Sequence, residues 1–424
     1  MSMFVDSPTD PVFKHAVNRP VPSIHEGIEA FPGEGLRVLG HYGENAMPEC
    51  VENPTDPGIP TLAAVCDPVE LAKHLSLLSL PWDWDTSQAI RLRLLKWHRE
   101  SRCTFEIALK VAGGWQELIG KVYAEDRSDI YQAMEEIRRA GFGSDAEFAL
   151  PRPLAYLAPL RLLLYEKAPG TRARELILNP RDSEDILAAE RCAHWLARFQ
   201  ALAPRLGPVY TLDGHLSSLK QWCQSLSDHG GPFAKKASLL FEGLKEAAAG
   251  LGRIELCPGH GTYTPGQVLL DGGRTITIDW DTYEMADPCR DVARFVVEIK
   301  RNAWKHLGSL HAYDRAAGIF VKTYFAAAHA AITPNLAFHE AAICLERAKH
   351  DRDKQVQGWQ QKAEIMLDEG LRILSTDPIE YATATRSVQV ALAHRYENGV
   401  AAAANKTAFI LGLVAEALLD LSGA

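Results

Sequence analysis

Two short motifs joined by a tight turn constrain the fold of this chain more than any other feature. The polar tripeptide His260-Gly261-Thr262 leads toward the apolar run 268–270, and a second apolar run, 275–278, ends at Asp279. The turn sequence Asp271-Gly272-Gly273-Arg274 separates the two runs. Because glycine adopts the backbone angles of tight turns, this order predicts a strand, a turn and a second strand. A polar segment therefore precedes the hairpin, and a carboxylate follows it.

This layout resembles the catalytic loop and the metal-binding carboxylate of the aminoglycoside phosphotransferase and choline kinase family, which has the protein-kinase-like fold. The resemblance implies a bilobal α+β protein with a small antiparallel-sheet N-lobe and a larger helical C-lobe. It also implies ATP and Mg²⁺ as cofactors. The chain departs from the family pattern at one position. Where the family has His-Gly-Asp, this chain has Thr262 in place of the aspartate, so the usual catalytic base is missing.

The segment from residue 93 to 170 has the order of elements of a kinase-type N-lobe. Alternating apolar residues in 90–95, a polar break at 98–102 and the Gly113-Gly114 turn predict three antiparallel strands. The strands are followed by a predicted helix and two further predicted strands, at residues 129–140, 155–157 and 160–165. Helical periodicity dominates the rest of the chain, at residues 183–201, 216–226, 233–251, 291–305, 310–332, 336–350 and 355–375.

These patterns divide the chain into four predicted parts. Residues 1–88 form a proline-rich arm with one short helix at 69–80, and residues 89–167 form the N-lobe. Residues 168–375 form the helical C-lobe, which contains the catalytic-loop region 254–291, and residues 376–424 add a helical extension.

Composition and charge argue against several classes of partner. The 424 residues are 47% apolar and 23% charged, as in ordinary globular proteins, and the net charge of −9 is spread along the chain. This balance disfavours nucleic acid and anionic membrane surfaces and suits a neutral or cationic small molecule. The eight cysteines show no C-x-x-C pairing and no clustering with histidine. Reduced thiols in the cytoplasm are therefore expected, without a zinc site, a signal peptide or a membrane span.

Asp279 and Lys121 are the central site predictions, and we expect them to face one another across the cleft between the lobes. Asp279 follows a strand, where a carboxylate can hold Mg²⁺ on nucleotide phosphates; capping of the next turn is the alternative. The resemblance implies that Lys121 contacts the α and β phosphates and pairs with a helix glutamate. Glu135 and Glu136 are both candidates, and their helix positions differ by about 100°.

Four further residues take their predicted roles from the resemblance. His260 braces the catalytic loop without transferring protons, and Asp291 braces the same loop from the start of the next helix. Gln267 stands where the family has a second metal ligand, commonly Asn, and related maltokinases carry Gln there. Glu166 lies in the linker between the lobes, where backbone groups meet adenine.

Thr262 leaves two functions open. The first is transfer of phosphate to a hydroxyl of a small molecule of the aminoglycoside, amine or sugar type. The second is a pseudokinase that binds nucleotide or partners, because a threonine hydroxyl cannot replace a general base that is typically worth ~10²–10⁴-fold in rate. Adenylylation is a third and lesser possibility. The hairpin over the phosphates, residues 96–104, contains no glycine, so Arg99 or Arg102 is a candidate for a phosphate contact.

Overall fold

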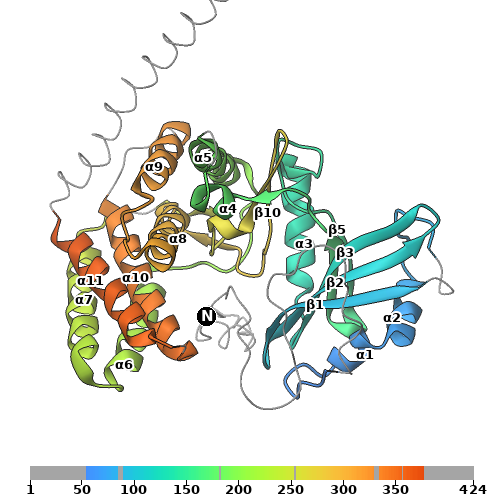
Figure 1. Ribbon diagram of the computed structural model, residues 1–424, viewed down its shortest axis with the longest axis horizontal. Helices are drawn as coiled ribbons and strands as arrows, with labels where there is room; N and C mark the ends of the chain where they lie inside the picture. The colour runs from blue at the N-terminus through green and yellow to red at the C-terminus, as the bar shows by residue number, and fades with distance from the viewer. Residues whose placement is uncertain are drawn as a thin grey trace, which may run out of the picture.

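The computed structural model describes residues 54–84, 89–180, 183–252, 255–328, 334–355 and 357–376. Figure 1 shows a twisted sheet on one side of the molecule and a bundle of helices on the other, which is the predicted bilobal α+β architecture. Most of the predicted N-terminal arm and the predicted extension after residue 376 lie outside the described residues.

The N-lobe sheet contains five strands in the order β1-β2-β3-β6-β5, and all neighbouring strands are antiparallel. They are β1 (Ile90–His98), β2 (Arg102–Val111), β3 (Gly114–Tyr123), β5 (Pro153–Leu157) and β6 (Leu162–Glu166). The predicted strands are present. Gly114, with a φ of 133°, allows the tight turn between β2 and β3.

The two faces of this sheet have different partners because side chains alternate along a strand. Outward-facing residues such as Ile107, Val122 and Leu164 pack against helices α1 (Leu62–Cys66) and α2 (Pro68–Leu75). Lys121 and Tyr123 belong to the opposite, inner face, on which α3 (Ser128–Ile137) and the C-lobe lie.

Helix α2 begins where the sequence predicts. The Asp67 carboxylate accepts hydrogen bonds from the backbone amides of Val69 (2.8 Å) and Glu70 (3.2 Å), and Pro68 occupies the first turn. The helix ends at Leu75, which is earlier than the predicted residue 80.

The C-lobe is built from eight helices among the described residues. These are α4 (Ala173–Leu178), α5 (Glu184–Leu202), α6 (Leu212–Ser227), α7 (Gly231–Ala249), α8 (Cys289–Leu307), α9 (Asp314–Ala327), α10 (Pro334–Lys354) and α11 (Trp359–Ser375). Buried ion pairs connect α8 to its neighbours: Arg294 to Glu346 (2.6 Å) in α10, and Lys300 to Glu369 (2.6 Å) in α11. Every helix predicted between residues 183 and 375 is present among these eight helices.

Short strands at the junction of the lobes hold the two motifs. The sheet β4-β10-β9-β7 contains the predicted hairpin, and β8 pairs with β11 beside it. Their bounds are β4 (Phe148–Ala149), β7 (Thr171–Arg172), β8 (Cys257–Gly259), β9 (Val268–Asp271), β10 (Arg274–Thr277) and β11 (Glu284–Ala286). Short helical turns complete the fold at Arg138–Phe142, Ala158–Leu160 and Pro265–Gln267.

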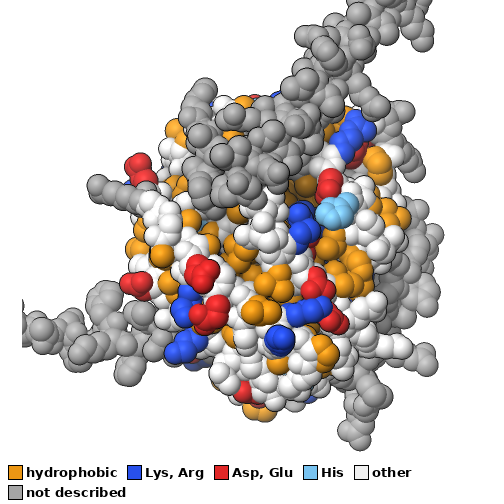
Figure 2. Space-filling model, turned by 90° about the vertical axis from the view of Figure 1, so that its left-hand side faces the viewer, with side chains coloured by type: hydrophobic (Ala, Val, Ile, Leu, Met, Phe, Trp, Pro, Cys, Tyr) orange, Lys and Arg blue, Asp and Glu red, His pale blue; other side chains and the backbone are white. Residues whose placement is uncertain are grey.

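The surface on the α7 and α11 side carries charges of both signs. In Figure 2, acidic and basic side chains lie among hydrophobic and uncharged ones on this face. Within the described ranges, no helix has both the length and the apolar character needed to cross a membrane.

Candidate active site

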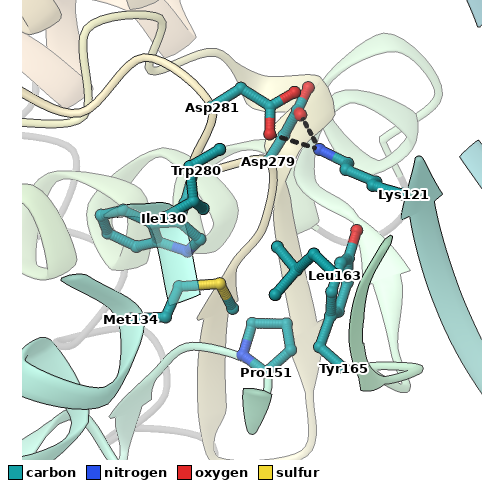
Figure 3. A pocket seen from close by; sticks show the side chains of 9 residues that line it. All are labelled: Lys121, Ile130, Met134, Pro151, Leu163, Tyr165, Asp279, Trp280 and Asp281. Carbon is teal, nitrogen blue, oxygen red and sulfur yellow. Dashed lines mark hydrogen bonds and ion pairs between the residues drawn. The ribbon is translucent and has the colours of Figure 1, made fainter. Parts of the chain in front are cut away.

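The site centres on Lys121, which projects from the inner face of β3. Its ammonium group donates a hydrogen bond to the Asp279 carboxylate and lies 3.1 Å from Oδ1 of Asp281 (Figure 3). The lysine side chain is 6% exposed, so both ion pairs are formed largely away from water. The structure thus brings together the lysine and the aspartate that the sequence predicts to face each other.

Buried Trp280 explains why two carboxylates point at one lysine. Its ring packs against His260 (4.8 Å between centroids) and Phe199 (5.2 Å), so the residue is anchored in the C-lobe core. The residues on either side, Asp279 and Asp281, then project toward Lys121, as Figure 3 shows. Asp279 has a φ of 73°, an uncommon conformation for a residue other than glycine. Such backbone strain is often found at functional sites.

Asp281 is fixed by the N-lobe. Its Oδ1 accepts a hydrogen bond from the Tyr123 hydroxyl (2.8 Å), and its Oδ2 lies 2.9 Å from Nε of Arg102. Arg127 donates to its backbone oxygen (3.0 Å). Sequence reasoning missed Tyr123, although alternation along β3 puts Tyr123 on the same face as Lys121. In the structure, Asp281 anchors the ammonium group of Lys121.

The close charges determine the protonation states of the cluster. Burial alone would raise the pKa of Asp279, but the charges of Lys121, Lys96 and Arg102 outweigh it and hold the pKa below its usual range. Burial likewise opposes the charge on Lys121, and the two aspartates nevertheless raise its pKa. The carboxylates and the ammonium are therefore all charged at neutral pH.

The predicted pairing of Lys121 with a helix glutamate is not found in the structure. Glu135 instead accepts hydrogen bonds from Arg138 (2.9 Å) and Arg139 (3.4 Å) within its own helix and the turn that follows. Glu136 is exposed to solvent. The physical reason is the helix phase: α3 turns the apolar Ile130 and Met134, one helical turn apart, toward the site.

Apolar side chains close the space behind the ion pairs. A cavity of about 10 Å³, enough for about one water molecule, lies there. It is lined by Lys121, Ile130, Met134, Pro151, Leu163, Tyr165, Asp279, Trp280 and Asp281 (Figure 3). A cavity of this size is too small for a nucleotide. The side chains that line it therefore form a closed wall behind Lys121.

The loop that carries His260 is braced by Asp291 at the start of α8. The carboxylate of Asp291 accepts hydrogen bonds from the backbone amides of His260 (2.7 Å), Gly261 (3.4 Å) and Tyr263 (3.2 Å). His260 Nε2 donates to the carbonyl oxygen of Ile278 (3.0 Å), which links the loop to the segment before Asp279. Burial lowers the pKa of His260 and favours the neutral ring. His260 and Asp291 are thus joined through the backbone of this loop.

Thr262 is buried in this loop beside another threonine. Its hydroxyl lies 2.9 Å from the Thr282 hydroxyl and 3.5 Å from Nδ1 of His260. Thr282 in turn donates to the carbonyl oxygen of His260 (3.2 Å). The Thr262 side chain therefore takes part in a network of neutral groups.

Gln267 contacts the predicted metal ligand. Its Nε2 donates to Oδ2 of Asp279 (3.3 Å), and its Oε1 accepts from the Thr264 hydroxyl (3.1 Å). Rotation of the carboxamide by half a turn would present its oxygen beside the carboxylate. Within the described residues, no group of three or more His, Cys, Asp or Glu could hold a metal.

Glu166 ends β6 at the connection to the C-lobe. Its backbone amide donates to the carbonyl oxygen of Arg152 (2.9 Å), while its side chain lies 4.0 Å from the Arg152 guanidinium. The neighbouring Lys167 pairs with Glu106 (2.6 Å) and Glu117 (2.7 Å). The linker side chains are thus occupied by contacts within the N-lobe.

Comparison with known proteins places this site in a family. The model of the phosphotransferase enzyme family, APH, matches residues 108–339, more than half of the chain. The chain belongs to this family. The matched range of this phosphotransferase includes Lys121, the loop that carries His260, and Asp279. A search of curated proteins finds no match.

Solved structures agree with the kinase-like fold of this phosphotransferase. A putative aminoglycoside phosphotransferase from Ralstonia eutropha JMP134 is 14% identical, with a TM-score of 0.51 over 72% of this chain and 97% of that one. Choline kinase LicA from Streptococcus pneumoniae is 13% identical, with a TM-score of 0.50 and coverage of 72% and 97%. A thermostable mutant of aminoglycoside phosphotransferase APH(4)-Ia is 17% identical, with a TM-score of 0.50 and coverage of 68% and 96%. The predicted family and fold are confirmed, and the pseudokinase alternative finds no support in these comparisons.

Proposed function

We propose that this phosphotransferase uses ATP and Mg²⁺ to phosphorylate a hydroxyl group of a small molecule of the aminoglycoside, amine or sugar type. The observation that carries the proposal is the convergence of Lys121, from the N-lobe sheet, with Asp279, from the hairpin of the catalytic region. The similar structures include proteins described as an aminoglycoside phosphotransferase and a choline kinase, which supports a small alcohol as acceptor.

The donor set at Asp279 fits a magnesium ion. A carboxylate and a carboxamide oxygen, from Asp279 and Gln267, are the hard ligands that Mg²⁺ prefers. The chemistry that the ion supplies when bound is neutralisation of negative charge on the phosphates. Lys121 would exchange its contact with Asp279 for the phosphates, while Asp281 keeps its ammonium group on the inner face of β3.

The nucleotide would lie in the cleft between residues 89–167 and 168–375, which we propose as the two lobes. Backbone groups near Glu166 would then meet the adenine ring, because the side chains of this linker already have partners. His260 and Asp291 would hold the catalytic loop against the acceptor. Positioning and electrostatic stabilisation supply most of the catalysis in phosphoryl transfer, so transfer does not depend on a base alone.

Thermal-shift titration with nucleotide tests this function. ATP with Mg²⁺ at about 100 times its Kd should stabilise the folded protein by ~2.7 kcal/mol and raise its melting temperature by a few degrees. EDTA should remove most of the shift, since the phosphates would then face the Asp279 carboxylate without a metal ion between them. A screen of hydroxylated amines and sugars should reveal acceptor-dependent ADP release. Absence of any shift at millimolar ATP would contradict the proposal.

Replacing Thr262 by Asp is expected to raise turnover, by as much as ~10²-fold. The new carboxylate would occupy the usual position of the base, and the Thr282 hydroxyl, 2.9 Å from the present hydroxyl, can donate a hydrogen bond to it. Thr262→Asn is the matched control, because the Asn side chain has the same shape as that of Asp but cannot act as a base. Turnover of both variants is measured with the best acceptor from the screen. A lower rate in the aspartate variant, with the fold intact, would give Thr262 a positive role of its own.

A further inference from the structure

The first strand of the N-lobe contains a β-bulge that redirects one lysine. Leu94 packs in the outer cluster with α1 and α2, and simple alternation would send residue 96 to the same face. The register shifts between Leu94 and Lys96, however, so that Lys96 stands opposite Thr104 on β2. Thr104 stands opposite Lys121 on β3. Because directly opposed residues share a face, Lys96 and Lys121 lie in one row on the inner face of the sheet.

A second row, two residues along each strand, adds an arginine to the same face. His98 stands opposite Arg102, and Arg102 stands opposite Tyr123. These two rows of the inner face therefore present three cations, Lys96, Arg102 and Lys121, beside the two carboxylates of the site. Three cations against two carboxylates leave one net positive charge before any metal or nucleotide binds.

Lys96 differs from the other two cations in its partners. Lys121 contacts both aspartates, and Arg102 lies 2.9 Å from Asp281. Within the described residues, no hydrogen bond or ion pair engages the Lys96 amine, although the side chain is half-buried. Burial lowers its pKa to about 8, and the charge of Asp279 offsets part of this effect. A half-buried ammonium group that has no partner among the described residues and lies near a metal-ligand candidate is suited to receive an anion.

The hairpin between β1 and β2 lacks glycine, and two of the backbone amides at its tip already have partners. Residues 96–104 contain no glycine. The amide of Glu100 donates to the Asp56 carboxylate (2.9 Å), and the amide of Ser101 donates to the carbonyl oxygen of His98 (3.1 Å). Asp56 also accepts from the Trp97 indole (2.8 Å) and pins the hairpin from outside. The amides of Glu100 and Ser101, two of the three residues at the tip, are therefore already used.

We propose that Lys96, with Arg102 beside it, forms a side-chain subsite for the polyphosphate tail of the nucleotide, in place of a glycine-rich hairpin. The identity of the ligand rests on the proposed function. The position of the subsite rests on the β-bulge at Lys96 and on the two rows of opposed residues that carry Lys96, Arg102 and Lys121. Lys96 is a binding residue in this proposal, because its ammonium group would contact a phosphate oxygen directly.

Calorimetric titration of Lys96→Met, Lys96→Arg and Lys110→Met with three ligands tests the subsite. Lys110→Met is the matched control, since Lys110 is a lysine of the same sheet that lies 5.5 Å from the Trp115 ring. Lys96→Met should weaken binding of Mg²⁺–ATP and of inorganic tripolyphosphate about 10-fold or more and leave adenosine unchanged. Lys96→Arg and Lys110→Met should bind all three as the wild type does.

The pH dependence of binding separates a phosphate contact from a structural role. Affinity of the wild type for tripolyphosphate should fall as pH rises through about 8, because the Lys96 amine then loses its proton. Lys96→Arg, which stays charged, should not show this fall. The charged and titratable groups that act on Lys96 are Asp279, Arg102, Lys121, Asp281 and His98.

The outcomes distinguish this inference from the proposed function. Normal ATP binding by Lys96→Met overturns the subsite and leaves the phosphotransferase function intact. Equal weakening for adenosine also overturns it, since Lys96 would then act through the fold. Tripolyphosphate binding that depends on Lys96, in a protein that does not bind ATP, supports the subsite and refutes the proposed nucleotide.

Discussion

Substitution of Asp279 by Asn is expected to lower kcat for phosphoryl transfer by about 10²–10³-fold. The carboxamide keeps the shape of the side chain but removes the negative charge that would hold Mg²⁺ against the phosphates. Lys121 retains Asp281 as a charged partner at 3.1 Å, so the N-lobe should stay folded. Steady-state kinetics with the best acceptor, together with the melting temperature of the variant, checks both parts of the expectation.

A carboxylate on the same hairpin provides the control for Asp279. Asp271 pairs with Arg274 at the turn between β9 and β10 and is half-exposed. Asp271→Asn removes the same charge from the same hairpin without touching the lysine, and its kcat should equal that of the wild type. If Asp279→Asn retained full activity while it remained folded, the metal-binding role of this aspartate would be wrong.

Gly261→Ala is expected to disrupt the catalytic loop, with a loss of about 3 kcal/mol or more in the free energy of unfolding. Gly261 has a φ of 80°, and a Cβ atom there would lie 2.1 Å from the carbonyl oxygen of Thr282. That obstacle is backbone, so either the loop or the segment after Asp281 must move. Either movement displaces Thr262, whose hydroxyl lies 2.9 Å from that of Thr282. Urea unfolding and ATP turnover should therefore both show a large loss.

Gly272→Ala separates the clash at Gly261 from backbone strain. Gly272 also has a positive φ, 52°, but a Cβ atom there would meet nothing within 4 Å. This variant should lose only about 1 kcal/mol and keep its turnover. Equal losses in the two variants would mean that backbone strain, and not the contact with Thr282, limits the loop.

The strands and the hairpin could be predicted because local rules control them. Alternation defines β1 to β3, and Gly272 at positive φ closes the turn between β9 and β10. The approach of Lys121 to Asp279 could be predicted only from the family resemblance, because 158 residues separate them. The two-residue strands β4 and β7 were missed, since such short segments become strands only through pairing with distant partners.

The second carboxylate partner of Lys121 could not be predicted from the sequence. Glu135 and Glu136 were candidates because the family resemblance implies a helix glutamate. Adjacent helix positions differ by about 100°, however, and the orientation of α3 depends on the residues that pack beneath it. Met134 takes the inward position, and Asp281 supplies the carboxylate from another segment. The β-bulge at Lys96 could not be predicted either, because no sequence pattern indicates one additional residue in a strand. Both outcomes depend on tertiary packing.

Asp291 connects the catalytic loop mechanically to helix α8 and to the helices that pack against α8. Its carboxylate receives three loop amides at the start of α8, and α8 is held further along by Arg294 with Glu346 and by Lys300 with Glu369. A small tilt of that helix would carry the loop with it. We therefore expect that loss of the Arg294–Glu346 or the Lys300–Glu369 ion pair would shift the loop and change turnover.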